Sequence, residues 1–425
     1  MKRNGTSLLR PVRVPGLQAV GMRFGRALGK RFTRNNLGVL AQAHAAYLAL
    51  RRSQKAIRGR GANIFTQWVG DPDALGSAVL LDAILRELGA KEVRILTGKL
   101  GHPQNRNLVA RCGITLHDPN TERLPKGLNC MVDTSPPLGR SNTGPVRKVK
   151  DYFFVADHHA DPADVEEDLR EAGVHRIKLP FVGLPVGSTS AFMAALGLAF
   201  GVLDGVGPAG RAAAALGIYT DTSALLHGAT PLDFRMFEKL TRDDETSDIV
   251  DELRDYRVPP EWFAYRASAF RNLEVTGSVR IAPVGYVRDD HRDVIAEIAS
   301  ELLRVENTSI GIAVAVTDMG TEVSVRADSR LLGQDRSRIV RVVDHVLEEA
   351  FPGVSGFKYE RRPPHRVEGG ACVPHHGEAA KLPRRGLRDH DDPAVLEHCS
   401  AYAIAILAAL DSLARENPEE VVGLL

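Results

Sequence analysis

Two aspartates, Asp71 and Asp73, stand two residues apart in a stretch that runs from Gln67 to Ser77. The stretch follows a short apolar, β-prone run (62–69) and precedes a helical pattern, so we expect both carboxylates on a loop between a strand and a helix. Loops at the carboxyl ends of strands are where open α/β sheets bind their ligands. Carboxylates hold hard divalent cations, and the free N–H groups of a helix start attract an anion. Asp-Pro-Asp is also common turn chemistry, so this motif alone favours a simple turn over a metal site.

Further acidic sites fall at similar places along the chain. They are Asp133 after the apolar run 130–132, Asp157-His158-His159 after the run 152–156, and Asp221 after the Ala- and Leu-rich helical segment 209–218. The carboxyl ends of parallel strands lie on one edge of a sheet, so we expect these side chains to converge. This recurrence favours a metal site over an isolated turn.

The charge of the four aspartates indicates two cations rather than one. Asp71, Asp73, Asp133 and Asp221 together carry −4, which two divalent cations would balance, and the cost of collecting unpaired carboxylates would then disappear. A set of oxygen and imidazole ligands favours Mn²⁺, with Mg²⁺, Co²⁺ or Fe²⁺ as alternatives. A pair of such ions can activate water and hold the oxygens of an in-line attack on phosphorus. Hydrolysis of a phosphate ester is the reaction that this chemistry predicts.

In this order, the four motifs resemble those of the DHH superfamily of phosphoesterases. They are Asp71-x-Asp73-Ala-x-Gly-Ser77, Val-Asp133, Asp157-His158-His159 and Thr-Asp221-Thr. The second half of the chain resembles the DHH-associated domain, with Ser324-Val-Arg326 and a Gly-Gly segment in the expected order. The resemblance covers about residues 61 to 385, and it is strongest to bifunctional oligoribonucleases that also dephosphorylate 3′-phosphoadenosine 5′-phosphate.

The resemblance implies a role for each matching residue. Metal ligands would be Asp71, Asp73, Asp133, His158 and Asp221, of which Asp133 and Asp221 would bridge the ions. Asp157 would orient a histidine, His159 would donate to the scissile phosphate, and Arg326 would hold substrate phosphate in a cleft between the domains. Substrate-binding residues would be Ser77, Ser324, Arg326, Gly369, Gly370 and His375. The substrate would be a short RNA or a nucleotide.

The chain departs from the family pattern at two places. Gln67 stands where the family usually has a histidine, so we expect one ion to be held more weakly or to gain a substitute ligand such as His102, although a loop role for His102 is the stronger interpretation. Ala371 and Cys372 stand where related enzymes have a third glycine and a histidine. Because the usual histidine is replaced here, we expect that either His375 or His376 contacts substrate, or that neither of them does.

The elements that must position these residues predict an α/β protein. Short apolar strands alternate with helices from residue 61 onward, which predicts an N-terminal, mostly parallel sheet with helices on both faces, and a smaller mixed α/β C-terminal domain. We expect four parts, namely a basic extension (1–60), a catalytic domain (61–230), a helical linker (231–275) and a substrate-binding domain (276–425).

The basic extension dominates the charge pattern. Fourteen of the 55 Lys and Arg and none of the 53 Asp and Glu lie in residues 1–60, so the extension carries +14 and the remainder −12. This arm is interpreted as a solvated face or helix end, with non-specific RNA contact or an organellar transit peptide as alternatives. The four scattered cysteines indicate a reducing compartment, and no run is long and apolar enough for a membrane span. We expect a cytoplasmic protein, and the sequence is silent on oligomeric state.

Other functions compete with this interpretation. A cyclic-dinucleotide or linear-dinucleotide phosphodiesterase would use the same ions, and the pocket walls would decide between the substrates. A nucleotide- or RNA-binding protein with weakened catalysis is a hypothesis from another class, motivated by Gln67, by the altered glycine segment and by the basic arm. The presence of all four ligand aspartates and both histidines argues against that second hypothesis.

Overall fold

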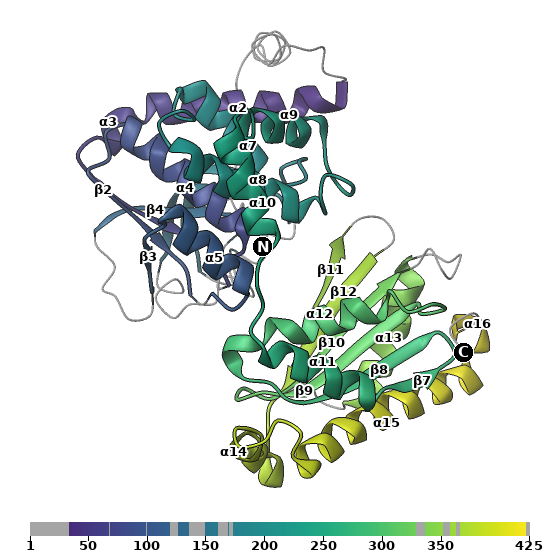
Figure 1. The fold of residues 1–425 in the computed structure, drawn as a ribbon. Helices are drawn as coiled ribbons and strands as arrows, with labels where there is room; N and C mark the ends of the chain where they lie inside the picture. The colour runs from purple at the N-terminus through teal and green to yellow at the C-terminus, as the bar shows by residue number, and fades with distance from the viewer. Residues whose placement is uncertain are drawn as a thin grey trace. The chain divides into compact units, whose positions relative to one another are not determined.

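The computed structural model divides into two compact units, residues 1–257 and 258–425, each with its own sheet (Figure 1). The expected α/β fold class, with a parallel sheet first and a mixed sheet second, is confirmed. The residues that the structure describes are 34–67, 69–98, 100–119, 126–135, 149–159, 169, 173–328, 336–351, 358–362 and 366–421. The first 33 residues of the predicted basic arm lie outside the described residues.

The first unit is built on a sheet in which every described strand pairing is parallel. Its strands are β1 (Gly61–Phe65), β2 (Glu92–Leu96), β3 (Leu116–His117), β4 (Gly127–Val132), β5 (Asp151–Asp157) and β6 (Arg176–Val182). They lie in the order β3-β2-β1-β4-β5-β6. The chain leaves β1 toward one side of the sheet and later returns to β4 on its other side. The carboxyl ends of β1 and β4 therefore flank a topological switch point, where sheets of this kind bind ligands.

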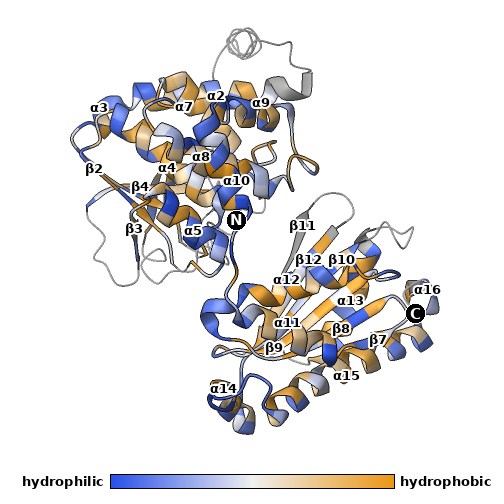
Figure 2. Ribbon diagram, in the orientation of Figure 1, coloured by the Kyte–Doolittle hydropathy of each residue, from blue (hydrophilic) through white to orange (hydrophobic). Residues whose placement is uncertain are grey.

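Helices pack against this sheet and form the larger core of the unit. They are α2 (Arg34–Arg52), α3 (Gln54–Ile57), α4 (Pro72–Glu87), α5 (Pro103–Cys112), α7 (Thr189–Phe200), α8 (Gly207–Asp221), α9 (Pro231–Leu240) and α10 (Asp244–Arg254). Ser188 caps the start of α7 by accepting from Ala191 N at 3.2 Å, and Gly201, at φ 72°, ends it in the left-handed conformation. Figure 2 shows hydrophobic residues concentrated along α4 and α7, which belong to this core.

Two glycines allow α4 and α8 to approach each other closely. A Cβ added to Gly76 of α4 would lie 2.7 Å from Ala213 O, and a Cβ added to Gly217 of α8 would lie 2.8 Å from Asp73 Cα. Real Cβ atoms do not make such contacts, so any larger side chain would push the helices apart. The two glycines therefore bring Asp73 and the end of α8 within reach of each other.

The helical end of the predicted basic extension belongs to the core of the first unit. Leu40, Ala43 and Leu50 of α2 and Ile57 of α3 are fully buried. The guanidinium of Arg51 lies 5.0 Å from the ring centre of Phe200, a cation–π contact. The expected boundary at residue 60 thus differs from the structure, because the apolar stripe of α2 packs against the domain while its basic residues remain at the helix end.

The second unit contains a mixed sheet with a hydrophobic core on each face. Its strands are β7 (Glu274–Thr276), β8 (Val279–Tyr286), β9 (Ile310–Val316), β10 (Thr321–Asp328), β11 (Lys358–Arg362) and β12 (Arg366–Val373), in the order β11-β12-β10-β9-β8-β7. Its helices are α11 (Glu261–Arg271), η2 (Asp289–His291), α12 (Asp293–Leu302), α13 (Arg336–Ala350), η4 (Gly377–Lys381), α14 (Leu382–Gly386), α15 (Pro393–Glu416) and α16 (Pro418–Val421). One core joins α11 and α12 to the sheet, and the other joins α13 and α15.

The segment expected to link the two domains is divided between them. Leu232 and Met236 of α9 and Ile249 of α10 are buried in the first core, whereas Trp262 of α11 is buried in the second unit. The division between Arg257 and Val258 falls immediately before Pro259-Pro260. Residues 231–275 therefore do not form a separate linker. Their helices are amphipathic, and the charged outer faces give the segment the composition of a linker.

Helix α15 has the length and composition of a membrane-spanning helix. One of its faces is nevertheless buried in the core of the second unit, through Val395, Cys399, Ala403 and Ile406. This arrangement is that of a core helix in a folded domain. No compartment follows from it, and the cytoplasmic location stays a prediction.

Candidate metal centre

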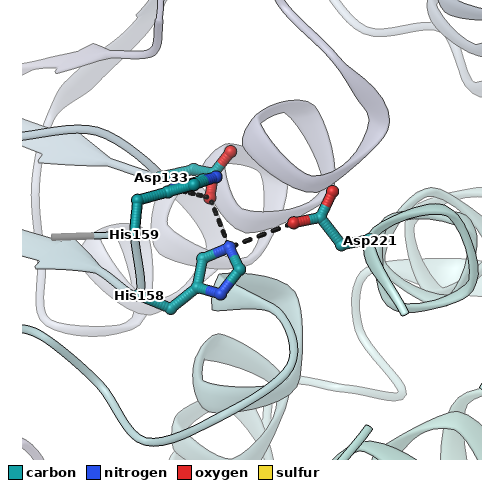
Figure 3. A group of neighbouring side chains, drawn as sticks. All are labelled: Asp133, His158, His159 and Asp221. Carbon is teal, nitrogen blue, oxygen red and sulfur yellow. Dashed lines mark ion pairs between the residues drawn. The ribbon is translucent and has the colours of Figure 1, made fainter. Parts of the chain in front are cut away.

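Segments far apart in the sequence bring four of the predicted residues together at the carboxyl edge of the first sheet. Asp133 follows β4, His158 and His159 follow β5, and Asp221 is the last residue of α8. One ligand atom from each of these residues lies within 4.8 Å of those of the other three (Figure 3). Within the described part of the chain, no other group of three or more His, Cys, Asp or Glu residues is this compact.

The imidazole of His158 lies at the middle of the group. Its Nε2 atom lies 3.0 Å from Asp221 Oδ2, 3.6 Å from Asp133 Oδ1 and 3.7 Å from Asp73 Oδ2. The structure thus places Asp73 beside the same nitrogen. Burial alone would lower the pKa of His158, but the bond to Asp221 and the charge of Asp73 outweigh burial and raise this pKa to about 9.

Asp133 is buried and has an unusual backbone conformation. Its φ of 59° is left-handed, a region in which Asn and Asp are the side chains most readily accommodated. Its Oδ1 accepts from Thr189 Oγ1 at 3.0 Å, while its Oδ2 is buried without a hydrogen-bond partner among the described residues. Burial, followed by the charges of Asp73 and Asp71, raises the pKa of Asp133 well above its ordinary value. A buried carboxylate oxygen with no donor is suited to a cation.

Asp73 belongs to the first turn of α4 and is fully buried, and its carboxylate contacts the start of α7. Its two carboxylate oxygens accept from Thr189 N and Ser190 N, each at 2.7 Å. Burial and the charge of Asp221 raise the pKa of Asp73, and these N–H groups at the helix start oppose that shift. Ser77, a predicted substrate-binding residue, is also fully buried, and its Oγ lies 3.3 Å from Ser190 Oγ. Ser77 therefore lies buried beside the start of α7, and its contact with substrate stays a prediction.

Asp71 caps helix α4 and is paired with Gln67. One oxygen of Asp71 accepts from Ala74 N at 2.9 Å, and the other accepts from Gln67 Nε2. Burial and the charge of Asp221 raise the pKa of Asp71 to about 6. In the position where related proteins were expected to have a metal-binding histidine, this chain has an amide that donates to the neighbouring carboxylate.

Asp157 orients His159. One oxygen of Asp157 lies 3.0 Å from His159 Nδ1 and accepts from His159 N at 3.1 Å, while the other accepts from Ser135 Oγ at 2.7 Å. Burial raises the pKa of Asp157, but the bonds to His159 and Ser135 outweigh it and lower the pKa to about 2. Asp157 therefore remains an anion that fixes the histidine ring.

These residues fit a resident divalent cation. Carboxylate oxygens of Asp133 and Asp221 and a ring nitrogen of each of His158 and His159 lie within 4.8 Å of one another, and Asp133 Oδ2 has no hydrogen-bond partner in the described part of the chain. Burial first, and then the charges of neighbouring aspartates, raise the pKa of Asp71 and of Asp133, and a cation would offset both effects. The substitute ligand suggested by the sequence, His102, instead caps α5 by accepting from Gln104 N at 3.2 Å, which agrees with its interpretation as a loop residue.

The residues predicted to bind substrate in the second unit fall on both faces of its sheet. Ser324 pairs in register with Gly370, Val325 with Gly369, and Arg326 with Glu368. Ser324 and Arg326 alternate with the buried Val323 and Val325, so they lie on the face opposite to α13 and α15.

His375 lies instead beside α15. Its Nε2 is 3.1 Å from Thr321 Oγ1, and the same hydroxyl is 2.9 Å from Nε2 of His398, a residue of α15. The side chain of Thr321 shares the orientation of the buried Val323. His375 is therefore separated from Ser324 and Arg326 by the sheet itself.

Several residues that support the centre were missed by sequence reasoning. Thr189 contacts both Asp73 and Asp133, Ser135 contacts Asp157, and Asp233 contacts the residues before α7. Among these residues, only the run Gly187-Ser-Thr-Ser190 has a recognisable sequence pattern, that of a helix start. Thr189 lies 56 residues from Asp133 and Gly187 lies 46 residues from Asp233, so these contacts depend on tertiary structure.

The comparisons with known proteins agree with this architecture. No family model matches the chain. An uncharacterized protein of Methanocaldococcus jannaschii, MJ1633, is 24% identical over 299 residues, which are 68% of this chain and 55% of that protein. The chain thus spans about half the length of the curated relative that it matches.

Two solved structures are similar in fold. An exopolyphosphatase-related protein from Bacteroides fragilis matches with a TM-score of 0.50 and 14% identity, over 82% of this chain and 97% of that one. The DHH domain of PF0399, described as a member of the s1p family of ribosomal proteins, matches with a TM-score of 0.40 and 14% identity, over 92% and 97%. The likeness to the exopolyphosphatase-related protein is one of fold alone, and that fold agrees with the resemblance to the DHH superfamily. The finer assignment to oligoribonucleases stays a prediction.

Proposed function

We propose that this chain is a divalent-cation-dependent phosphoesterase of the DHH fold. The observation that carries the proposal is the group formed by Asp133, His158, His159 and Asp221, whose ligand atoms lie within 4.8 Å of one another at a switch point of the sheet. A site of this composition suits cation-assisted attack on phosphorus. The fold similarity to an exopolyphosphatase-related protein is consistent with chemistry at a phosphate.

The proposed ligands are Asp71, Asp73, Asp133, His158 and Asp221. Mn²⁺ is the proposed ion, with Mg²⁺, Co²⁺ and Fe²⁺ as alternatives, because the donor set combines hard oxygens with an imidazole. Bound divalent cations would make water more acidic and would offset the negative charge that develops on the phosphoryl oxygens. Asp133 would be suited to a place between two cations, since its Oδ1 accepts from Thr189 and its Oδ2 has no hydrogen-bond partner among the residues that the structure describes.

The residues of the chain contribute positioning and proton donation. His159 is proposed to donate to the scissile phosphate, and the anionic Asp157 keeps its ring in place. Arg326 in the second unit is proposed to hold a substrate phosphate through its planar guanidinium, with Ser324 and the Gly369-Gly370 backbone beside it. The side chain of Glu368 lies 3.8 Å from Arg326, so part of this charge is already compensated.

Short oligoribonucleotides and nucleoside bisphosphates are the proposed substrates, and cyclic or linear dinucleotides are the alternative. A substrate panel tests this. The protein is stripped of metal with a chelator, reconstituted with Mn²⁺ and incubated with dinucleotides, longer RNA, bisphosphates and cyclic dinucleotides. Mn²⁺-dependent release of nucleotide or phosphate supports the proposal, and the preferred substrate identifies the class.

The test variant is Asp133→Asn, and its matched control is Asp151→Asn. Asn is tolerated at the left-handed φ of residue 133, so that variant removes a charge without straining the backbone. Asp151 is exposed at the start of β5, at the edge of the sheet away from the centre. We expect Asp133→Asn to abolish hydrolysis and Asp151→Asn to retain it. Full hydrolysis by Asp133→Asn would reject the proposal.

A binding protein with weakened catalysis is the second candidate function. The pairing of Gln67 with Asp71 favours it, because one carboxylate oxygen of Asp71 is occupied by an amide donor. Under this function the chain binds a member of the panel with Mn²⁺ present but releases no product. Hydrolysis that is lost in Asp133→Asn would exclude it.

A further inference from the structure

Asp233, on α9, is a fully buried carboxylate that accepts four hydrogen bonds. Its Oδ2 accepts from Gly187 N at 2.9 Å, from Thr230 N at 2.7 Å and from Thr230 Oγ1 at 2.6 Å. Its Oδ1 accepts from Ser188 Oγ at 3.0 Å. Every donor is a backbone N–H or a hydroxyl, so these bonds satisfy the buried charge.

This carboxylate joins the first turns of two helices. Asp233 closes a capping box with Thr230 at the start of α9, and it also binds Gly187 and Ser188 directly before α7. The partial positive charges at both helix starts favour an anion there. Replacing the carboxylate would release the N-cap residue of α7 on one side and the start of α9 on the other.

The turn that Asp233 holds is the one that fixes two proposed metal ligands. Thr189 and Ser190 follow Ser188 directly, and their N–H groups donate to both oxygens of Asp73. Thr189 also donates through its hydroxyl to Asp133. A shift of the first turn of α7 would therefore move Asp73 and Asp133 together.

The same cluster also supports the chain after Asp221. A Cβ on Gly187 would lie 2.7 Å from Thr222 Cγ2 and 2.8 Å from Gly228 O, so these segments interlock. The residues after Thr222 have positive φ values of 47°, 63° and 64° at Ser223, Ala224 and Leu225. Three consecutive non-glycine residues in this conformation are costly and persist where their surroundings hold them.

We propose that Asp233 is a positioning residue that sets the geometry of the metal centre without touching metal or substrate. The inference rests on the proposed function, because it gives Asp233 a role toward the proposed ligands. It acts through Ser188 and Gly187 on α7, and through the packing of Gly187 on the segment that follows Asp221.

The test measures Mn²⁺ binding to the chelator-treated full chain by calorimetry. In Asp233→Ala, buried donors lose their acceptor and the start of α7 is freed, so we expect the Mn²⁺ dissociation constant to rise about tenfold or more, equal to about 1.4 kcal/mol. Asp233→Asn keeps a carbonyl oxygen for the three donors now at Oδ2, and we expect it to recover most of the affinity. With excess Mn²⁺, the alanine variant should regain most of its kcat.

The matched control is Asp243→Ala. Asp243 also caps a helix of this unit, accepting from Thr246 N at 3.1 Å and from Thr246 Oγ1 at 2.8 Å, and it pairs with Arg211 at 2.9 Å. Loss of either cap destabilises the fold, but only Asp233 connects to α7. Equal Mn²⁺ affinities in the two alanine variants would overturn the proposal, as would an Asp233→Asn variant as weak as Asp233→Ala.

A second variant covers the case in which Asp233→Ala does not fold. Ser188→Ala removes the hydroxyl that links Asp233 to α7 and leaves the bonds to Gly187 and Thr230 in place. We expect a smaller loss of Mn²⁺ affinity, about threefold, because one cap bond is lost. Unchanged affinity would overturn the inference. A wild-type chain that binds no Mn²⁺ would instead overturn the proposed function.

Discussion

Neighbouring carboxylates of the centre differ in what their oxygens accept. Both oxygens of Asp157 are occupied by His159 and Ser135, and its pKa is lowered to about 2. One oxygen of Asp133 has no donor among the described residues, and its pKa is raised. The two occupied oxygens of Asp157 suit it to orienting His159, and the oxygen of Asp133 without a partner suits it to a cation. The hydrogen bonds thus support different proposed roles for these two carboxylates, which the sequence alone suggests only through resemblance.

The role of Asp157 leads to a prediction at this scale. Asp157→Asn should reduce kcat about 10- to 100-fold, because His159 loses the anion that fixes its ring. The Mn²⁺ dissociation constant should change little, since Asp157 is not a proposed ligand. Ser135→Ala, which removes one of the bonds to Asp157, should have a smaller effect in the same direction. A loss of Mn²⁺ affinity that matches the loss of kcat would show that Asp157 is itself a ligand.

At the scale of elements, the close contact between α4 and α8 determines whether Asp73 and Asp221 meet. Gly217 lies one turn before Asp221, and a Cβ there would come within 2.6 Å of Ser190 Oγ and 2.8 Å of Asp73 Cα. Gly217→Ala should therefore destabilise the chain by about 1–3 kcal/mol and weaken Mn²⁺ binding. Chemical denaturation and calorimetry measure the two effects.

Gly38→Ala is the matched control for this substitution. Gly38 also lies within a helix, α2, but a Cβ there meets nothing within 4 Å. The higher helix propensity of alanine should make that variant neutral or up to about 1 kcal/mol more stable. If both variants behave alike, the close approach of α4 and α8 does not position the centre.

The contact between β10 and the start of α12 predicts a pH dependence of stability. Burial raises the pKa of Glu322 to about 7, although its salt bridge with Arg292 opposes this. The folded chain therefore holds this proton between about pH 4.5 and 7 while the unfolded chain releases it, so stability falls as pH rises through that interval, by at most about 3 kcal/mol. Glu322→Gln should flatten this decline in denaturation curves measured from pH 4.5 to 8. An unchanged decline would exclude Glu322 as its source.

Strands and helices with regular patterns were predictable, whereas contacts between them were not. The alternation of strands and helices predicted β1, β2, β4 and β5, and the Ala- and Leu-rich run after Ser188 predicted α7, because local sequence determines such elements. The buried stripes of α9 and α10 were taken for a linker, since their charged faces dominate the composition. The pairing of Ser324 with Gly370 depends on strand register, and the convergence on Asp233 depends on tertiary packing. Neither leaves a local signal in the sequence.

At the scale of the whole molecule, chemistry and substrate recognition are assigned to different units. Every proposed metal ligand lies in residues 1–257, which have a core of their own, and the residues proposed to hold substrate phosphate lie in 258–425. The helical part of the basic extension belongs to the first unit, so a truncation meant to remove the arm should stop before Arg34.

This division predicts how the units behave when they are separated. Residues 1–257 alone should bind Mn²⁺ with an affinity close to that of the full chain and should hydrolyse a small aryl phosphodiester. For a dinucleotide, the KM should rise about tenfold or more, because one charge-assisted contact contributes about 1.5–3 kcal/mol. Arg326→Ala in the full chain should raise the same KM and leave hydrolysis of the aryl ester unchanged. If the first unit retains the full-chain KM for the dinucleotide, the second unit does not recognise substrate, and Arg326 would then have a structural role that includes its contacts with Glu368 and Ser324.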